Sequence, residues 1–106
     1  MVIEWAPFRM VAGVGEEELF EASQALQSDF LVLQGGFVRR ELVHVDEDQW
    51  ADLVYWRDEA SAAKAMESAA SSPVCFKYFE LMVDADHAEP GQGVQLLTVR
   101  RRYPEE

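Results

Sequence analysis

The chain of 106 residues has a single cysteine and no run of more than four consecutive apolar residues. One cysteine excludes an intrachain disulfide and a cysteine zinc cluster, and the short apolar runs exclude a membrane-spanning helix. Basic residues are scarce too: 9 Lys and Arg stand against 20 Asp and Glu, a formal net charge of −11. Because this charge repels phosphate groups, we expect neither nucleic acid nor a membrane surface as a partner. These absences favour a cytoplasmic protein.

The length and the composition predict one globular domain over residues 1–106. Apolar residues make up 49% of the chain, which is enough for a hydrophobic core. The length is close to the commonest size of a domain. A single domain of this size buries a modest part of its surface, so association with a second copy would add to its stability.

Apolar residues in strand-like runs predict four strands, at about 2–11, 37–45, 50–57 and 94–103. Pro7 conflicts with the first run, because proline cannot donate to a β-ladder, and we expect a bulge or kink there. Three acidic residues at 46–48 separate the second run from the third. This short polar loop predicts an antiparallel hairpin.

Helices are predicted between these strands. Glutamates at 16–18 favour a helix start, and an apolar stripe at steps of three and four continues to residue 33. The glycine pair at 35–36 is expected to cap the end of this helix. Asp58 is typical of an N-cap, and the helix after it is expected to run to about residue 70. Ser72–Pro73 favours the start of a third, short helix.

The order of the predicted elements defines the fold class. Strand, helix, two strands, two helices and a last strand give an α+β, ferredoxin-like βαββαβ arrangement with an extra short helix and a four-stranded antiparallel sheet. Helices would cover one face of this sheet. Strands one, three and four carry large apolar residues on both faces, so the second face also needs a cover. We therefore expect a homodimer whose two sheets form a dimeric α/β barrel.

Several segments, spread over nearly the whole chain, carry a family resemblance. They are Ile3–Phe8, Gly36–Leu42, Trp50–Trp56 with the alanine-rich helix after it, and Ser72–Cys75 with Phe79. Together they resemble the antibiotic-biosynthesis-monooxygenase (ABM) family of dimeric α+β barrels. These motifs are structural, so the resemblance implies the fold far better than the activity. Families similar in fold include cofactor-independent oxygenases of polycyclic aromatics, quinol oxygenases and haem-degrading enzymes.

The chain departs from this family in having no asparagine. The haem-degrading branch uses an Asn, Trp and His set, and several aromatic-oxidising members place an Asn near the substrate. We therefore assign neither set of catalytic residues to this chain. The resemblance then implies a cofactor-independent monooxygenase acting on a small aromatic or quinol-like compound. The alternative is a non-catalytic dimeric barrel that binds a small hydrophobic ligand.

Four aromatic residues are candidates for holding such a ligand. Tyr55 and Trp56 are neighbours on the third predicted strand and therefore point to opposite faces of the sheet. Phe76 and Phe79 belong to the short third helix and are expected to point inward. Aromatic rings hold flat ligands by stacking. The alternative for all four is ordinary packing in the core or in the dimer interface.

His87 and Glu4 are the candidate proton acceptors. A base that takes the proton of a phenolic substrate allows the resulting carbanion to react with oxygen without metal or flavin. The carboxylates around His87 could instead make it a surface cation. Glu4 needs a partner or a raised pKa if it is buried, and the candidate partners are Arg39, Arg40 and Arg100–Arg102.

We predict neither a metal nor an organic cofactor. Asp84, Asp86, His87 and Glu89 are of the residue types that bind divalent ions, but their spacing matches no standard metal-binding loop. Acidic loops are common in a chain this negative. The sequence also contains no glycine-rich phosphate loop and no nucleotide-binding fingerprint.

Overall fold

The computed structural model describes residues 1–83 and 94–104 of the chain. Its elements are, in order, β1 (Val2–Arg9), α1 (Glu16–Asp29), the 3-10 turn η1 (Leu31–Leu33), β2 (Phe37–Asp46), β3 (Gln49–Trp56), α2 (Glu59–Ala69), α3 (Pro73–Phe79) and β4 (Gln95–Thr98). The four strands form one antiparallel sheet in the order β2-β3-β1-β4. The predicted α+β, ferredoxin-like fold is confirmed.

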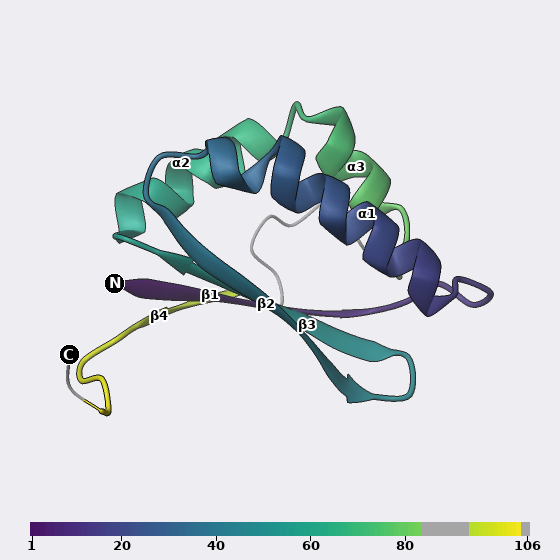
Figure 1. Ribbon diagram of the computed structural model, residues 1–106, viewed down its shortest axis with the longest axis horizontal. Coiled ribbons are helices and arrows are strands. Elements are labelled where there is room, and N and C mark those ends of the chain that lie inside the picture. Colours follow the sequence, from purple (N-terminus) through teal and green to yellow (C-terminus); the bar gives the residue numbers. More distant parts are fainter. Residues whose placement is uncertain (84–93, 105–106) are drawn as a thin grey trace.

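The helices α1, α2 and α3 all lie on one face of this sheet and leave its other face open in the single chain (Figure 1). Side chains alternate between the two faces along each strand. On β3 the helix-facing positions Trp50, Asp52, Val54 and Trp56 are all buried. The hydrophobic core therefore fills the space between the sheet and the helices.

Side-chain caps begin both helices that follow the hairpin, as the sequence predicts. The carboxylate of Asp58 accepts a hydrogen bond from the backbone N–H of Ser61 at 2.8 Å, and α2 starts at the next residue. The hydroxyl of Ser72 accepts one from the N–H of Cys75 at 3.3 Å. Each cap supplies a partner for an N–H group that has none within its own helix.

Pro7 lies inside β1 without the predicted bulge, in unbroken register opposite Ala51. The carbonyl of Arg9 accepts a hydrogen bond from the N–H of Val83, which is not part of β3. Alternate residues of a strand point their backbone groups to the same side, so the nitrogen of Pro7 also points away from β3. On that side β4 pairs with β1 only as far as Trp5. The proline therefore removes no donor from the ladder between β1 and β3.

The first helix ends earlier than predicted. α1 ends at Asp29, and the buried Phe30 leads into η1, while Leu33 is 73% exposed and lies outside the apolar stripe. Gly36 has a φ of +83°, but its carbonyl accepts a hydrogen bond from Arg57 at 2.7 Å. The glycine therefore leads into β2, close to α2, rather than capping α1. The last strand is also shorter than predicted.

Among the residues that the structure describes, no helix is both long enough and apolar enough to cross a membrane.

Gly36 and Gly35 provide a matched pair of alanine substitutions. Gly36 has a positive φ, and a Cβ there would collide with the side chain of Ser61, whereas Gly35 has open space around it. We expect Gly36→Ala to lower the free energy of unfolding by at least 1–2 kcal/mol, roughly the cost of the left-handed conformation alone. Gly35→Ala should change it by less than about 0.5 kcal/mol. Urea unfolding followed by circular dichroism measures both, and equal effects would contradict this account of Gly36.

Candidate functional site

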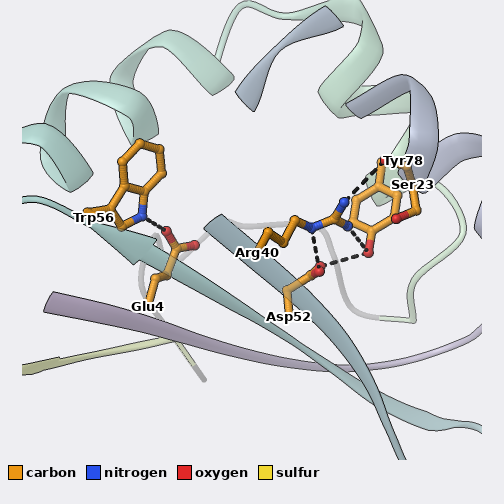
Figure 2. Close-up of polar contacts among 6 residues, drawn as sticks. All are labelled: Glu4, Ser23, Arg40, Asp52, Trp56 and Tyr78. Atoms are coloured by element: carbon orange, nitrogen blue, oxygen red, sulfur yellow. Dashed lines mark hydrogen bonds and ion pairs between the residues drawn. The ribbon is translucent and has the colours of Figure 1, made fainter. Parts of the chain in front are cut away.

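A closed set of polar contacts lies in the core between the sheet and two helices. Arg40 of β2 donates from Nε to Asp52 Oδ1 of β3 at 2.8 Å and from Nη2 to the Tyr78 hydroxyl of α3 at 3.0 Å. Tyr78 in turn donates to Asp52 Oδ2 at 2.7 Å, which completes the Arg40–Asp52–Tyr78 ring (Figure 2). A further bond from Arg40 Nη1 reaches the Ser23 carbonyl of α1 at 3.2 Å.

Burial makes this ring electrostatically strong. The side chains of Arg40 and Asp52 are only 5% and 9% exposed, so each charge depends on the other for solvation. Burial, together with the negative charge of Asp52, raises the pKa of the Tyr78 hydroxyl. Tyr78 therefore stays protonated at neutral pH and acts as a hydrogen-bond donor to Asp52.

A second carboxyl, the partly buried one of Glu4, pairs with an indole rather than with an arginine. Glu4 lies on β1, and its Oε1 accepts a hydrogen bond from Trp56 Nε1 of β3 at 3.0 Å (Figure 2). The expectation of an ion pair with Arg39, Arg40 or Arg100–Arg102 is wrong for Arg40, which is committed to Asp52. Within the described residues the bonding partner of Glu4 is an uncharged N–H.

The surroundings of Glu4 favour its neutral form. Burial raises the pKa of its carboxyl above the ordinary glutamate value, and the negative charge of Asp52 adds to this effect, while the Trp56 hydrogen bond acts in the opposite direction. The sheet register explains the proximity of the two carboxyls. Ala6 lies opposite Asp52 and Glu4 lies opposite Val54, so Glu4 and Asp52 are diagonal neighbours on one face.

The structure separates the four candidate ligand-binding aromatics. Trp56 is 1% exposed and lies in the core next to Glu4. Tyr55 lies on the open face, where its hydroxyl donates to Glu41 and its ring contacts the guanidinium of Arg39. Phe76 is 47% exposed, so the expectation that it points inward is wrong. Phe79 is partly buried against the core.

His87 lies outside the described residues, as do Asp84, Asp86 and Glu89. Within residues 1–83 and 94–104, no group of three or more His, Cys, Asp or Glu side chains is arranged to hold a metal ion. Cys75 is buried on α3, and burial raises the pKa of its thiol. A raised pKa keeps the thiol protonated and weakly reactive.

Two hollows in the described part of the chain lie away from Glu4. One, of about 310 Å³, lies between α1 and β2 and includes Arg40 in its wall. Another, of about 450 Å³, lies at the hairpin end of β1 and β3 and includes Trp5 and Trp50. Neither is lined by Glu4 or Trp56.

Sequence reasoning missed the Arg40–Asp52–Tyr78 ring. The position of Asp52 in the sequence indicates a buried charge, because this residue falls on the same strand face as Trp50 and Trp56. A buried charge requires a partner. That partner is twelve residues away on β2, and Tyr78 comes from a helix later in the chain. Only the folded arrangement brings them together.

No protein-family model matches the sequence, and no curated protein sequence matches it. Solved structures do match. Two crystal structures of SnoaB, a cofactor-independent oxygenase from Streptomyces nogalater, give TM-scores of 0.73 and 0.71 at 20% and 21% sequence identity, covering 98% of this chain and 97% of SnoaB. A conserved protein from Methanosarcina mazei Go1 gives a TM-score of 0.62 at 13% identity, covering 95% of this chain and 92% of that chain.

A proposed antibiotic biosynthesis monooxygenase from Nitrosomonas europaea is also similar, with a TM-score of 0.51 at 11% identity and coverage of 92% of this chain and 94% of that chain. What these structures share with this chain is a ferredoxin-like α+β fold. This chain has an ABM-like fold, as the resemblance in its sequence implies.

The buried Arg40–Asp52 pair and the exposed Arg57–Asp58 pair are a matched test of the polar ring. Arg40→Met leaves Asp52 as an uncompensated buried charge, and we expect a loss of about 3–5 kcal/mol in the free energy of unfolding. Arg57 and Asp58 are 72% and 51% exposed, so Arg57→Met should cost less than about 1 kcal/mol. Removing both charges in Arg40→Met/Asp52→Leu should recover most of the loss. Urea unfolding measures all three variants, and equal costs for the two arginines would contradict the role given to the ring.

Proposed function

We propose that this protein is a cofactor-independent monooxygenase acting on a small phenolic or quinol-like compound, with Glu4 as the proton acceptor. The observation that carries the proposal is the partly buried Glu4 carboxyl, which Trp56 holds on the helix-facing side of the sheet. Its raised pKa makes it a stronger base than an exposed glutamate. The fold shared with SnoaB, a cofactor-independent oxygenase, supports the reaction class.

The chemistry needs a base and no electron carrier, because the substrate itself supplies the electrons. Glu4 takes the proton of the phenolic O–H, and the electron-rich ring carbon forms a C–O bond with O₂. The protonated carboxyl then returns its proton to the terminal oxygen of the peroxide. Loss of the remaining C–H proton with cleavage of the O–O bond gives a carbonyl group and one molecule of water. Overall, a CH₂ group and one O₂ become one C=O group and one H₂O. In the phenolic tautomer of the substrate, one of the two hydrogens of this CH₂ group is on the phenolic oxygen.

The contacts of Glu4 suit this task. Oε1 is occupied by the Trp56 N–H at 3.0 Å, which leaves Oε2 to accept the proton. The indole bond fixes the orientation of the carboxyl, and a fixed orientation lowers the entropic cost of proton transfer. Trp56 and Phe79 are then the proposed aromatic contacts of the substrate on this face. Phe76 would contact a ligand only from the protein surface, and Tyr55 only from the open face of the sheet. His87 is the alternative proton acceptor.

Oxygen uptake with a panel of phenols and hydroquinones tests the proposal. For a substrate that supports uptake, we expect Glu4→Gln to lower the rate by about 10²–10⁴-fold, the usual contribution of a general base. The carboxylate is the active form, so the wild-type rate should fall as the pH is lowered through the pKa of Glu4. Because that pKa is raised, the fall should come at a higher pH than the roughly 4.3 of an ordinary glutamate.

Glu67→Gln, on the exposed side of α2, is the matched control and should leave the rate unchanged. His87→Ala tests the alternative acceptor. A large loss in His87→Ala with normal uptake in Glu4→Gln would transfer the role to His87. No uptake with any compound would favour the alternative of a non-catalytic protein that binds a hydrophobic ligand.

We further propose that the protein is a homodimer in which two copies pack through their open sheet faces. Apolar side chains occupy the middle of this face: Ile3, Trp5, Leu53, Tyr55 and Leu97. The helices cover only the opposite face (Figure 1). A large exposed apolar surface is costly in water, and an identical sheet is a complementary cover that closes the assembly with two-fold symmetry.

A charge placed in the middle of the open face should separate the two copies. We expect the wild-type protein to sediment at twice the mass of one chain, and Leu53→Arg to sediment as a monomer, since an unpaired buried charge opposes association. Met66→Arg, on the outer side of α2 at 39% exposure, is the control and should stay dimeric. Analytical ultracentrifugation at micromolar concentration measures all three. A monomeric wild-type protein would overturn the proposal.

A further inference from the structure

Glu4 and Asp52 are neighbours on the helix-facing side of the sheet. Glu4 lies opposite Val54, which is two positions along β3 from Asp52, and diagonal neighbours of this kind are roughly 7–8 Å apart. Ala6, the next residue of β1 on this face, lies opposite Asp52 and has only a methyl side chain. Both carboxyls point from the sheet toward the helices (Figure 2). No large side chain of β1 therefore lies between the two charges.

The groups that bond to the two carboxyls decide which of them takes up a proton. Asp52 Oδ1 accepts from the Arg40 guanidinium at 2.8 Å, and Oδ2 accepts from the Tyr78 hydroxyl at 2.7 Å. Each oxygen of Asp52 thus has its own donor, and one donor is a cation, which favours the ionised form of a carboxyl. Glu4 has one neutral donor, the Trp56 N–H. A proton that enters this pair of carboxyls therefore goes to Glu4, and Asp52 keeps its negative charge.

Among the described residues, the other groups that pack around Glu4 are uncharged. Its neighbour on β4 is Leu96, and the buried side chains of α2, which packs against β1, are small and neutral. The two buried titratable groups of α3, Cys75 and Tyr78, are neutral because burial raises the pKa of each. The charged side chains of the three helices are all exposed: Glu16–Glu18, Glu21, Asp29, Glu59, Lys64, Glu67, Lys77 and Glu80.

We propose that Asp52 is a positioning residue for the proposed base, because its fixed negative charge makes Glu4 a stronger proton acceptor. A nearby negative charge favours the protonated form of a carboxyl. Partial burial of Glu4 acts in the same direction and is the larger cause, so Asp52 adds to a base strength that burial already raises. Asp52 acts through Glu4 and exchanges no proton itself. Its role in the reaction rests on the proposed function, whereas the coupling of the two carboxyls does not.

A pH titration of the full-length protein by ¹³C NMR measures this coupling without a substrate. The Cδ signal of Glu4 is identified by its loss in Glu4→Gln, and the midpoint is the pH at which this carboxyl is half-protonated. We expect Asp52→Asn to lower the midpoint by about one pH unit, as for two charges roughly 7 Å apart at an effective dielectric constant of about 35.

Asp46→Asn is the matched control, because it removes the same charge from an exposed position. Asp46 lies opposite Gln49, and Gln49 lies opposite Arg9, five residues along β1 from Glu4. That spacing is about 17 Å, which exceeds the Debye length of about 8 Å at physiological salt. The midpoint of Glu4 should therefore stay unchanged in this variant.

A second variant covers the case in which Asp52→Asn does not fold, since that change leaves the buried Arg40 without its counter-charge. Arg40→Gln/Asp52→Asn replaces both charges by amides that can bond to each other. Arg40 comes from β2, one strand further from Glu4 than β3, so the loss of the nearer negative charge should dominate. We expect the midpoint to fall by roughly half a pH unit.

Oxygen uptake then tests the role of Asp52 in the reaction. For a substrate that supports uptake, the midpoint of the pH–rate profile should fall with the NMR midpoint in Asp52→Asn, and the rate at high pH should drop about threefold because a weaker base takes the proton less readily. A purely structural role would lower the rate and leave the midpoint in place. An unchanged midpoint of Glu4 in the ring variants overturns the inference. A lowered midpoint without any uptake would support the coupling and overturn the proposed function alone.

Discussion

Arg40 and Asp52 compensate each other's charge in the core of the protein, and the packing of the helices on the sheet depends on this ion pair. The two charges lie 2.8 Å apart on neighbouring strands, and each would be very costly to bury alone. Tyr78 joins the pair from α3, and the Ser23 carbonyl joins it from α1. One guanidinium therefore connects β2, β3, α1 and α3. A shift of either helix along the sheet would break bonds to a buried charge, so the ring selects one arrangement of these elements.

The same buried charge influences the second carboxyl. Glu4 lies diagonally across from Asp52 on the helix-facing side of the sheet, and burial and the charge of Asp52 both raise the pKa of its carboxyl. Arg40 compensates Asp52 but makes no bond with Glu4. The sheet thus holds two carboxyls in contrasting environments, one paired with a cation and one held by the indole of Trp56. Environments that differ in this way are typical of sites where carboxyls have separate chemical roles.

Much of the fold could be predicted from local patterns. The strands, the hairpin and the caps at Asp58 and Ser72 follow from side-chain alternation and from short-range hydrogen bonding, which act over a few residues. Errors arose where a distant element decided the outcome. Pro7 needs no bulge because β4 ends at Trp5 on that side. Gly36 has its positive φ beside Ser61 of α2, which the pattern around the first helix does not indicate.

The candidate site was harder to predict than the fold. Glu4 and Trp56 could be named as residues of interest, but their hydrogen bond joins positions 52 residues apart. The sequence by itself determined the order of the elements and the face on which each strand residue lies, because backbone alternation and capping are local. Only the tertiary structure decided that Asp52, and not Glu4, takes Arg40 as its partner. A buried charge bonds to whichever group the packing brings within about 3 Å, and that distance depends on the whole chain.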